Sequence, residues 1–364
     1  MKLTKSLFLA FAGLGLFACS NEDVTTDATV DGGKSKTMVI SLNGISEGSR
    51  AISAAEEEGE VALNKVAIFY TTTAGNVGHV TTLSNTDGEN WRNLTNGTGY
   101  VEHSLPASIA QVYVVGNYDA LLGNLNEIGT AEILEAKVIN AAAQQTFGNV
   151  LLYGKDIDGL ESVEAGDGTH TENVVKAEMT ISPLVSRLEI SGIQCEDLGN
   201  QYTSIDLKKI GLTNFYTTTT VGGTIGDLQA PAESAEAQET IWESNSWAAD
   251  AISGASLTSN ETVWSPAEGK VFSYNIIPNS TLATEKLQVR LLVDAKRGTT
   301  NDPISNTLIA NIDRQLAAGK IYKMTYKFKE ENVGPWDPTN TQCVIVDVTV
   351  SDWEVVNLTP SFVE

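Results

Sequence analysis

The sequence predicts an all-β chain with one or two short helices, arranged as two tandem β-sandwich domains. Apolar residues recur at every second position in many short segments, which is the period of a half-buried strand. Gly, Asn, Asp and Thr separate these segments and favour turns. With 364 residues the chain is long enough for about two or three ordinary domains. Many strands with little helix predict sandwiches.

The composition indicates a folded, acidic protein. Hydrophobic residues make up 41% of the chain, so a packed core can form. The 23 lysines and arginines face 46 acidic residues, which gives a formal net charge of −23. Nucleic acid recognition needs a basic surface to neutralise phosphates, so a nucleic acid partner is excluded.

The first residues form a targeting segment. Two lysines precede the apolar run Ser6–Phe17, which is too short to span a membrane as a helix. The run ends in Leu16-Phe17-Ala18-Cys19, which resembles the lipobox of bacterial lipoprotein signal peptides. Residues 1–18 are therefore predicted to be a signal peptide, and Cys19 to be diacylated and anchored in the outer membrane. The alternative is an ordinary signal peptide with a chance cysteine.

A tether and a short strand follow. Residues 19–35 are small and polar and predict a flexible linker. In the next stretch, Lys36–Arg50, apolar side chains alternate on one face of a predicted strand, at Met38, Ile40 and Leu42. A turn-rich loop then leads to Arg50, the sole basic residue between Lys36 and Lys65. This isolation suits an arginine-specific protease, although a lone surface arginine usually has no function.

The first domain is predicted to span residues 36–182. Its expected strands are Val61–Thr71, Val77–Leu83, Gln111–Val115, Leu151–Tyr153 and Val174–Ser182. Thr130–Gln145 predicts the one clear helix, capped by Thr130 and carrying an apolar stripe. Thr86–Gly99 is rich in Asn, Gly and Thr and predicts a loop.

The second domain is predicted to span residues 183–364, after the Ser182-Pro183 break. It contains a further series of alternating segments and a long polar insertion at Ala230–Thr258. Three tryptophans in or near the insertion are candidates for a sugar-stacking platform, although tryptophans more often anchor cores: Trp242, Trp247 and Trp264.

The tail, residues 343–364, contains the most regular alternation in the chain. Its apolar face is predicted to comprise Val344, Val346, Val348 and Val350, with Trp353 in a second short strand. Such a strand can fill an open groove in another chain by β-augmentation. The alternative is that it completes the second domain of its own chain.

No pattern of reactive residues predicts an enzyme. The three histidines are widely separated, and neither a metalloprotease motif, a phosphate-binding loop nor a nucleophile elbow is present. Asp156–Gly159 is faintly similar to a calcium loop but lacks the later acidic ligands, so neither a metal nor a cofactor is predicted. Cys195 and Cys343 could pair or remain free.

Taken together, several local patterns resemble the fimbrillin family, the subunits of type V pili. Besides the lipobox and the loop arginine, they are Leu105-Pro106-Ala107 before QVYVVGN, Leu151-Leu152-Tyr153-Gly154, Ser186-Arg187-Leu188, Ala317-Ala318-Gly319-Lys320-Ile321-Tyr322 and the terminal VTVSDWEVVNLTP. None of them is specific alone. Their order and spacing across residues 36–364 carry the resemblance.

The resemblance implies two transthyretin-like β-sandwich domains and assembly by strand exchange. An arginine-specific protease would cut after Arg50, remove the strand containing Met38, Ile40 and Leu42, and leave Ala51 as the first residue. The expected partners are other copies of the chain, related fimbrial subunits and a host glycan or protein receptor. The expected location is the outer membrane and then the fimbrium. A shaft subunit is the first hypothesis. The alternatives are a tip adhesin or a monomeric glycan-binding lipoprotein.

Overall fold

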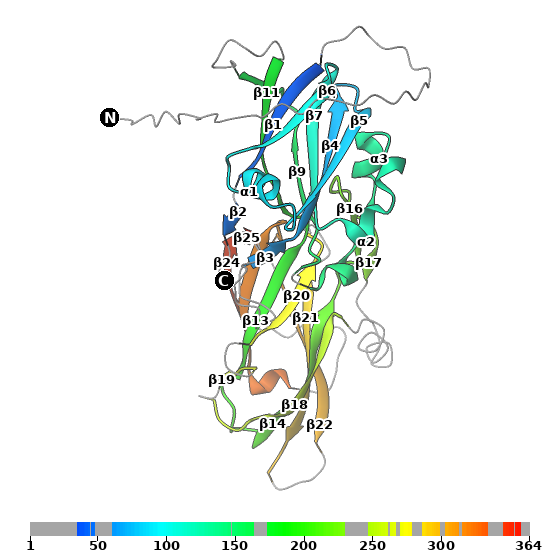
Figure 1. The fold of residues 1–364 in the computed structure, drawn as a ribbon. Helices are drawn as coiled ribbons and strands as arrows, with labels where there is room; N and C mark the ends of the chain where they lie inside the picture. The colour runs from blue at the N-terminus through cyan, green and yellow to red at the C-terminus, as the bar shows by residue number, and fades with distance from the viewer. Residues whose placement is uncertain are drawn as a thin grey trace, which may run out of the picture. The chain divides into compact units, whose positions relative to one another are not determined.

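A computed structural model describes most of the chain from Ser35 onward, and these residues form one contact unit. The described residues are 35–43, 45–47, 60–146, 148–163, 173–229, 247–260, 263–266, 270–278, 286–298, 303–312, 315–333, 345–352 and 354–357. Strands dominate and the helices are short, so the predicted all-β class is confirmed (Figure 1).

Two sheets enclose the core of the N-terminal half. One has the order β10 (Glu161–Val163), β11 (Asn173–Thr180), β1 (Ser35–Asn43) and β6 (Tyr100–Pro106). The other has the order β12 (Ser182–Pro183), β9 (Leu152–Asp156), β7 (Ile109–Gly116), β4 (Lys65–Thr72) and β5 (Val77–Ser84). Both contribute to a cluster of buried apolar side chains, here called the N-terminal core, which includes Ile40, Ile68, Val114 and Ala177.

Strand β4 is apolar along nearly its whole length because both of its faces are covered. Val66, Ile68 and Tyr70 point into the N-terminal core, whereas Ala67 and Phe69 belong to a separate buried cluster on the other side of the sheet. Short helical segments supply the cover on that side: α2 (Asp119–Leu122), η1 (Leu125–Glu127) and α3 (Ala131–Glu135). This explains why the pattern of β4 is a continuous run rather than an alternation. The short η2 (Ala141–Gln144) instead places Ala141 in the N-terminal core.

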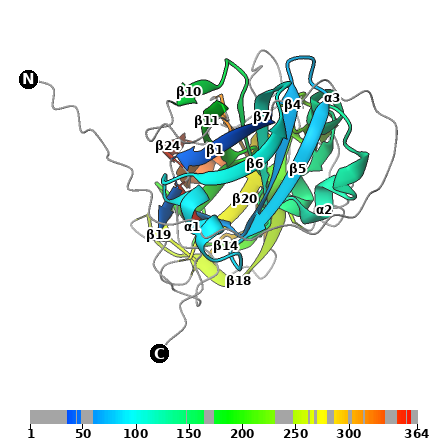
Figure 2. The same cartoon turned by 45° about the horizontal axis from the view of Figure 1, so that its top comes forward.

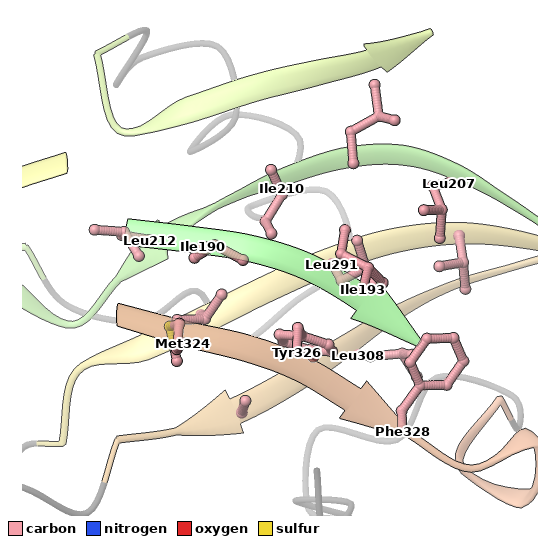
Figure 3. Close-up of a cluster of buried hydrophobic side chains, with 14 of the residues drawn as sticks. Ile190, Ile193, Leu207, Ile210, Leu212, Leu291, Leu308, Met324, Tyr326 and Phe328 are labelled. Atoms are coloured by element: carbon pink, nitrogen blue, oxygen red, sulfur yellow. The ribbon is translucent and has the colours of Figure 1, made fainter. Parts of the chain in front are cut away.

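Two further sheets form the C-terminal half. One contains β19 (Val263–Trp264), β13 (Ser186–Cys195), β23 (Lys320–Phe328) and β24 (Ile345–Asp352), with β20 (Phe272–Ile276) also paired to β13. The other has the order β18 (Ala249–Leu257), β14 (Ser204–Thr213), β21 (Gln288–Lys296) and β22 (Ile304–Asn311). Their apolar faces meet in the C-terminal core, where Ile210, Leu291, Met324 and Phe328 lie together (Figure 3). The short η3 (Glu330–Asn332) follows β23.

Several backbone contacts join the two halves. β8 (Val138–Asn140) pairs with β16 (Thr218–Thr220), next to the small ladder of β15 (Phe215–Tyr216) and β17 (Leu228–Gln229). Asn275 donates its side-chain amide to the Gln144 carbonyl at 2.6 Å, and its backbone N–H donates to Gln145 Oε1 at 3.0 Å. The division at residues 182 and 183 stays a prediction, because these contacts do not test whether each half folds alone.

The long helix predicted for Thr130–Gln145 is wrong. Thr130 does cap a helix, since its hydroxyl accepts from the Ile133 N–H at 3.2 Å, but α3 ends at Glu135. The chain then turns into β8, which pairs with β16 from the other half. Pairing with a distant strand therefore outweighs the local helical propensity of this segment.

Two predictions of irregular structure also need correction. The predicted loop Thr86–Gly99 contains α1 (Glu89–Thr95), whose Trp91 and Leu94 belong to the N-terminal core. The predicted insertion Ala230–Thr258 contains β18. Both segments are rich in polar and small residues. Their few apolar residues are too widely spaced to show the period of a helix or a strand.

The tryptophans and the cysteine of the second half are packing residues where they are described. Trp247 meets Phe215 edge-on with ring centroids 5.1 Å apart, Trp264 stacks on Phe272 at 5.9 Å, and both pack against the C-terminal core. The glycan-binding alternative is left with Trp242, outside the described residues. Cys195 is a buried free thiol, and burial raises its pKa to about 12. Cys343 also lies outside the described part.

Candidate functional site

Strand β1 occupies an interior position in its sheet. It runs parallel to β11, with Lys36 opposite Asn173 and Asn43 opposite Thr180. On its other edge it runs antiparallel to β6, with Ile40 opposite Tyr100. Figure 2 shows β1 lying between these two strands. Loss of β1 would therefore divide the sheet and expose the facing edges of β6 and β11.

The predicted apolar face of β1 points into the N-terminal core. Met38 and Ile40 are fully buried and Leu42 is 1% exposed. Burying each such side chain contributes about 1.5–3 kcal/mol to stability. This strand thus contributes three buried side chains to the core, although it stands at the start of the described chain.

The opposite face of β1 is covered in part, at Thr37 and Ser41. Ser41 is 1% exposed, and its hydroxyl is without a hydrogen-bond partner in the described structure. Gly99, which has a φ of 100°, lies directly against this face: a Cβ there would come within 2.3 Å of Val39 Cγ1. Helix α1 also contacts β1, and its Trp91 and Leu94 join the same core cluster as the apolar face of this strand. The surroundings of β1 therefore form a closely fitting groove.

A carboxylate on β6 ties this strand to the opposite sheet. Glu102 Oε2 accepts hydrogen bonds from Thr81 Oγ1 at 2.6 Å, the Tyr100 hydroxyl at 2.9 Å and the Tyr70 hydroxyl at 3.4 Å. His79 Nε2 lies 3.9 Å from the same oxygen. Because Tyr70, His79 and Thr81 belong to β4 and β5, this cluster holds β6 in place without using β1. Sequence alone gave no signal for it.

Alkaline pH should lower the free energy of unfolding of the N-terminal half. Burial, together with the nearby Glu102 carboxylate, raises the pKa of Tyr70 and of Tyr100. Above pH about 10 the unfolded chain loses protons that the folded chain still holds, so the free energy of unfolding should fall as the pH rises. Denaturant titrations at a series of pH values should show this decline, and Tyr70→Phe should make it shallower. An equally steep decline in Tyr70→Phe would show that the raised pKa of Tyr70 does not contribute to the loss of stability.

The predicted tail strand is docked on its own chain. β24 pairs antiparallel with β23, and the register places Val346 opposite Tyr326, Val348 opposite Met324 and Val350 opposite Tyr322. These three partner residues belong to the C-terminal core. In this structure the tail therefore completes the sheet of its own second half, as the alternative for this segment predicted.

The end of the tail joins the segment that follows β1. β25 (Glu354–Asn357) lies between β2 (Ile45–Glu47) and β3 (Glu60–Leu63), and both pairings are parallel. Ile45 lies opposite Val355, which lies opposite Val61. Figure 1 places the β2, β25 and β3 labels together. Strands at Val61 and after Trp353 were predicted, but β2 and the pairing of the three strands were not, because a three-residue strand shows little alternation and pairing leaves no local pattern.

The remaining predicted site residues lie outside the described part of the chain: Cys19, Arg50, Ala51, Val344 and Trp353. Across the described residues, no group of three or more His, Cys, Asp or Glu is placed to hold a metal ion. Among the helices described, none is both long and apolar enough to cross a membrane.

Comparison with known proteins gives structural matches without sequence matches. No family model matches the chain, and no curated protein matches it significantly. Among solved structures, a candidate cell adhesion protein from Bacteroides eggerthii is similar, with a TM-score of 0.58 and 14% identity over 90% of this chain and 98% of the other. A fimbrilin from Porphyromonas gingivalis gives a TM-score of 0.53 and 11% identity over 90% and 99%.

A candidate cell adhesion protein from Parabacteroides distasonis is similar to the same degree, with a TM-score of 0.54, 12% identity and coverage of 89% and 98%. At such low identities these matches establish the fold. The chain spans nearly the whole length of each match. The resemblance to fimbrillins is thus confirmed at the level of the fold.

Proposed function

We propose that this chain, which has the fold of a fimbrilin, is a structural subunit of a cell-surface fimbrium that polymerises by donor-strand exchange. The observation that carries the proposal is the position of β1. It is an interior strand with three core side chains, yet the chain segment that connects β1 and β2 to β3 contains an isolated arginine. Such a strand can act as a replaceable part of the core.

In this proposal the chain is exported as a lipoprotein and held in the outer membrane through Cys19. An arginine-specific protease then cuts after Arg50, which makes Ala51 the first residue of the mature subunit. The cut separates β1 from the sandwich it completes. It also separates the subunit from its lipid, so the subunit can join a fibre.

Removal of β1 would leave a groove for one strand. Neighbouring strands lie about 4.7–4.9 Å apart, so β6 and β11 would be separated by about twice that distance. Their facing backbone groups would be unpaired, which is costly in a buried site. The Glu102 cluster supports this role, because it attaches β6 to the other sheet independently of β1.

The cut leaves the contacts between β1 and the groove unchanged. It changes how well β1 competes with a strand from another chain for that groove. While β1 is covalently attached, its effective concentration at the groove is in the millimolar range or above. A strand from a neighbouring chain cannot readily compete at such concentrations. After the cut, β1 can diffuse away and leave the groove to a strand that remains tethered to a neighbouring subunit.

The proposed donor is the tail of another copy. Its alternating residues Val344, Val346, Val348 and Val350 replace the core face of β1, with Trp353 following. Each buried valine contributes about 1.5–3 kcal/mol before the cost of ordering the strand. A subunit with both a removable first strand and a donor tail suits the fimbrial shaft. Its partners are then further copies, related fimbrial subunits and, at the cell surface, a host receptor.

Replacing Arg50 with alanine should abolish processing and fibre growth. We expect Arg50→Ala chains to keep Cys19 as their first residue and to form no detergent-resistant, heat-labile ladders in surface extracts. The matched control is Arg92→Ala, which removes an exposed arginine from α1 and should leave processing and ladders unchanged. Unchanged ladders in Arg50→Ala would contradict the cleavage step.

A tail truncation tests the donor role separately. Chains that lack residues 343–364 should still be processed at Arg50 and should accept a strand at the end of a fibre, but should not extend it. Shorter fibres are therefore expected when this variant is mixed with the wild type. Normal fibres formed by the truncated chain alone would rule out the tail as donor.

A further inference from the structure

We infer that β2 is a lock on the end of the tail, so that one cut after Arg50 both opens the groove and loosens the tail at β25, from where the release of the donor strand β24 can begin. This inference rests on the proposed function and adds its timing. β2 belongs to the segment that the cut would remove, and β25 belongs to the tail. The two strands pair with each other in the uncut chain.

Strands β2 and β3, here called the bracket, pair with the tail strand β25 along its two edges. Ile45 to Glu47 pair with Val355 to Asn357 on one side. Glu60 to Leu63 pair with Glu354 to Asn357 on the other side. The two outer strands are consecutive in the chain, with Arg50 in the connection between them. The bracket is therefore one covalent piece until the chain is cut.

The two sides of the bracket differ in how firmly they belong to the fold. Val61, Ala62 and Leu63 of β3 are fully buried, and the Ala62 carbonyl accepts from Asn117 Nδ2 at 2.7 Å. In β2, Ile45 is half-buried and packs against the edge of the N-terminal core. β3 is thus the fixed side of the bracket, and β2 is the side that can be removed.

Loss of β2 would change the tail from an interior strand to an edge strand at this point. A three-stranded sheet would become a two-stranded parallel ladder of four residue pairs. Two-stranded structures are marginally stable in water unless packing supports them. The end of the tail should then fray from β3, and fraying at Asn357 can spread towards β24 and its ladder with β23.

This arrangement would keep uncut chains from assembling prematurely. A chain that retains β1 has no vacant groove. The same chain retains β2, which keeps the end of its own tail paired in the sheet of β2, β25 and β3. Both properties end together when residues 36–50 leave. Chains still attached to the membrane would be inactive as acceptors and as donors.

Hydrogen exchange of the full chain, purified in detergent, tests the lock without any cut. The test variant carries Ile45→Gly, Ser46→Asn and Glu47→Gly, which remove the strand character of β2 and retain β1. We expect amides 354–357 to exchange at least about tenfold faster than in the wild type, because they lose one neighbour strand. Amides 38–42 should keep their protection, which would show that the fold persists.

The matched control alters another three-residue edge strand. Glu161→Gly, Ser162→Asn and Val163→Gly disrupt β10, which pairs with β11 and not with the tail. This variant should leave amides 354–357 as protected as in the wild type. Equal protection of 354–357 in the wild type and in the β2 variant would overturn the inference, and so would equal loss in both variants.

A disulfide provides a converse test that does not depend on weakening β2. Ile45→Cys with Val355→Cys joins two residues in register on neighbouring strands, at a spacing that a disulfide can bridge. The bridged chain, once cut at Arg50, should keep amides 354–357 protected and should not extend fibres until reductant is added. Fibre growth with the bridge intact would contradict the lock.

The two hypotheses fail in different ways in these experiments. If the wild-type chain forms no fibres under any condition, the proposed function fails, while the exchange of amides 354–357 still decides whether β2 holds the tail. If wild-type fibres form but the β2 variant shows unchanged exchange, the lock fails and the proposed function stands.

Discussion

The full chain carrying Ile40→Ala should lose about 2–5 kcal/mol of unfolding free energy, the usual cost of truncating a large aliphatic side chain in a core. Ile40 is fully buried in the N-terminal core, midway along β1 and between Met38 and Leu42. β6 and β11 pair with the two edges of β1 and keep its backbone in place. The cavity left by the missing side-chain atoms can therefore collapse only in part. Chemical denaturation followed by circular dichroism measures the loss.

Val39→Ala is the matched control for this prediction. Val39 belongs to the same strand but points away from the core and is half-buried. Its truncation should cost less than about 1.5 kcal/mol, because two partly exposed methyl groups contribute little. Equal losses in the two variants would show that β1 has no distinct core face.

Ile40→Ala should also make the groove easier to enter. A synthetic peptide spanning residues 343–357 competes with β1 for the same site in the proposed exchange. Weakening β1 by about 2–5 kcal/mol should raise peptide binding to the uncut chain by at least about tenfold, since 1.4 kcal/mol corresponds to a tenfold change in equilibrium. Unchanged peptide binding would indicate that the tail uses another surface.

Asn117→Ala should be among the most destabilising single substitutions outside β1. The residue is buried and adopts a φ of 57° directly after β7. Its Nδ2 donates to the carbonyls of Ala62 at 2.7 Å and Val150 at 2.9 Å, and its Oδ1 accepts from the Asn64 N–H at 3.0 Å. One side chain therefore joins the corner after β3 to the segment before β9.

The expected loss for Asn117→Ala is about 3 kcal/mol or more, because alanine leaves buried backbone groups unpaired and must also adopt a left-handed conformation. Asn117→Gly separates the two causes. Glycine accepts the positive φ without strain, so it should recover about 1 kcal/mol while the hydrogen bonds remain absent. Thermal and chemical denaturation of the two variants give the difference. If glycine were no better than alanine, backbone strain would play no part.

Most of the strand positions could be predicted because alternation is a local property. Val77–Leu83 and Gln111–Val115 lie within observed strands, and Met38, Ile40 and Leu42 share the predicted buried face. The pattern says which side chains face a core. It contains no information about which strand lies on either edge.

The errors arose where a distant partner overrides a local preference. The segment after Glu135 has good helical residues, yet β8 forms there because β16 offers a ladder. The Glu102 cluster draws on β4, β5 and β6, whose positions in space bring its members together. None of these groupings corresponds to a spacing that can be read along the chain.

The first strand illustrates both sides of this division. Composition and alternation were sufficient to predict a short strand at Met38–Leu42 with one apolar face, since the two-residue period follows from backbone geometry. Two features are visible only in the folded chain. The first is the position of β1 between β6 and β11, and the second is the pairing of β2 with β25. Strand pairing is set by backbone hydrogen bonds between remote segments, and every residue except proline offers the same donor and acceptor.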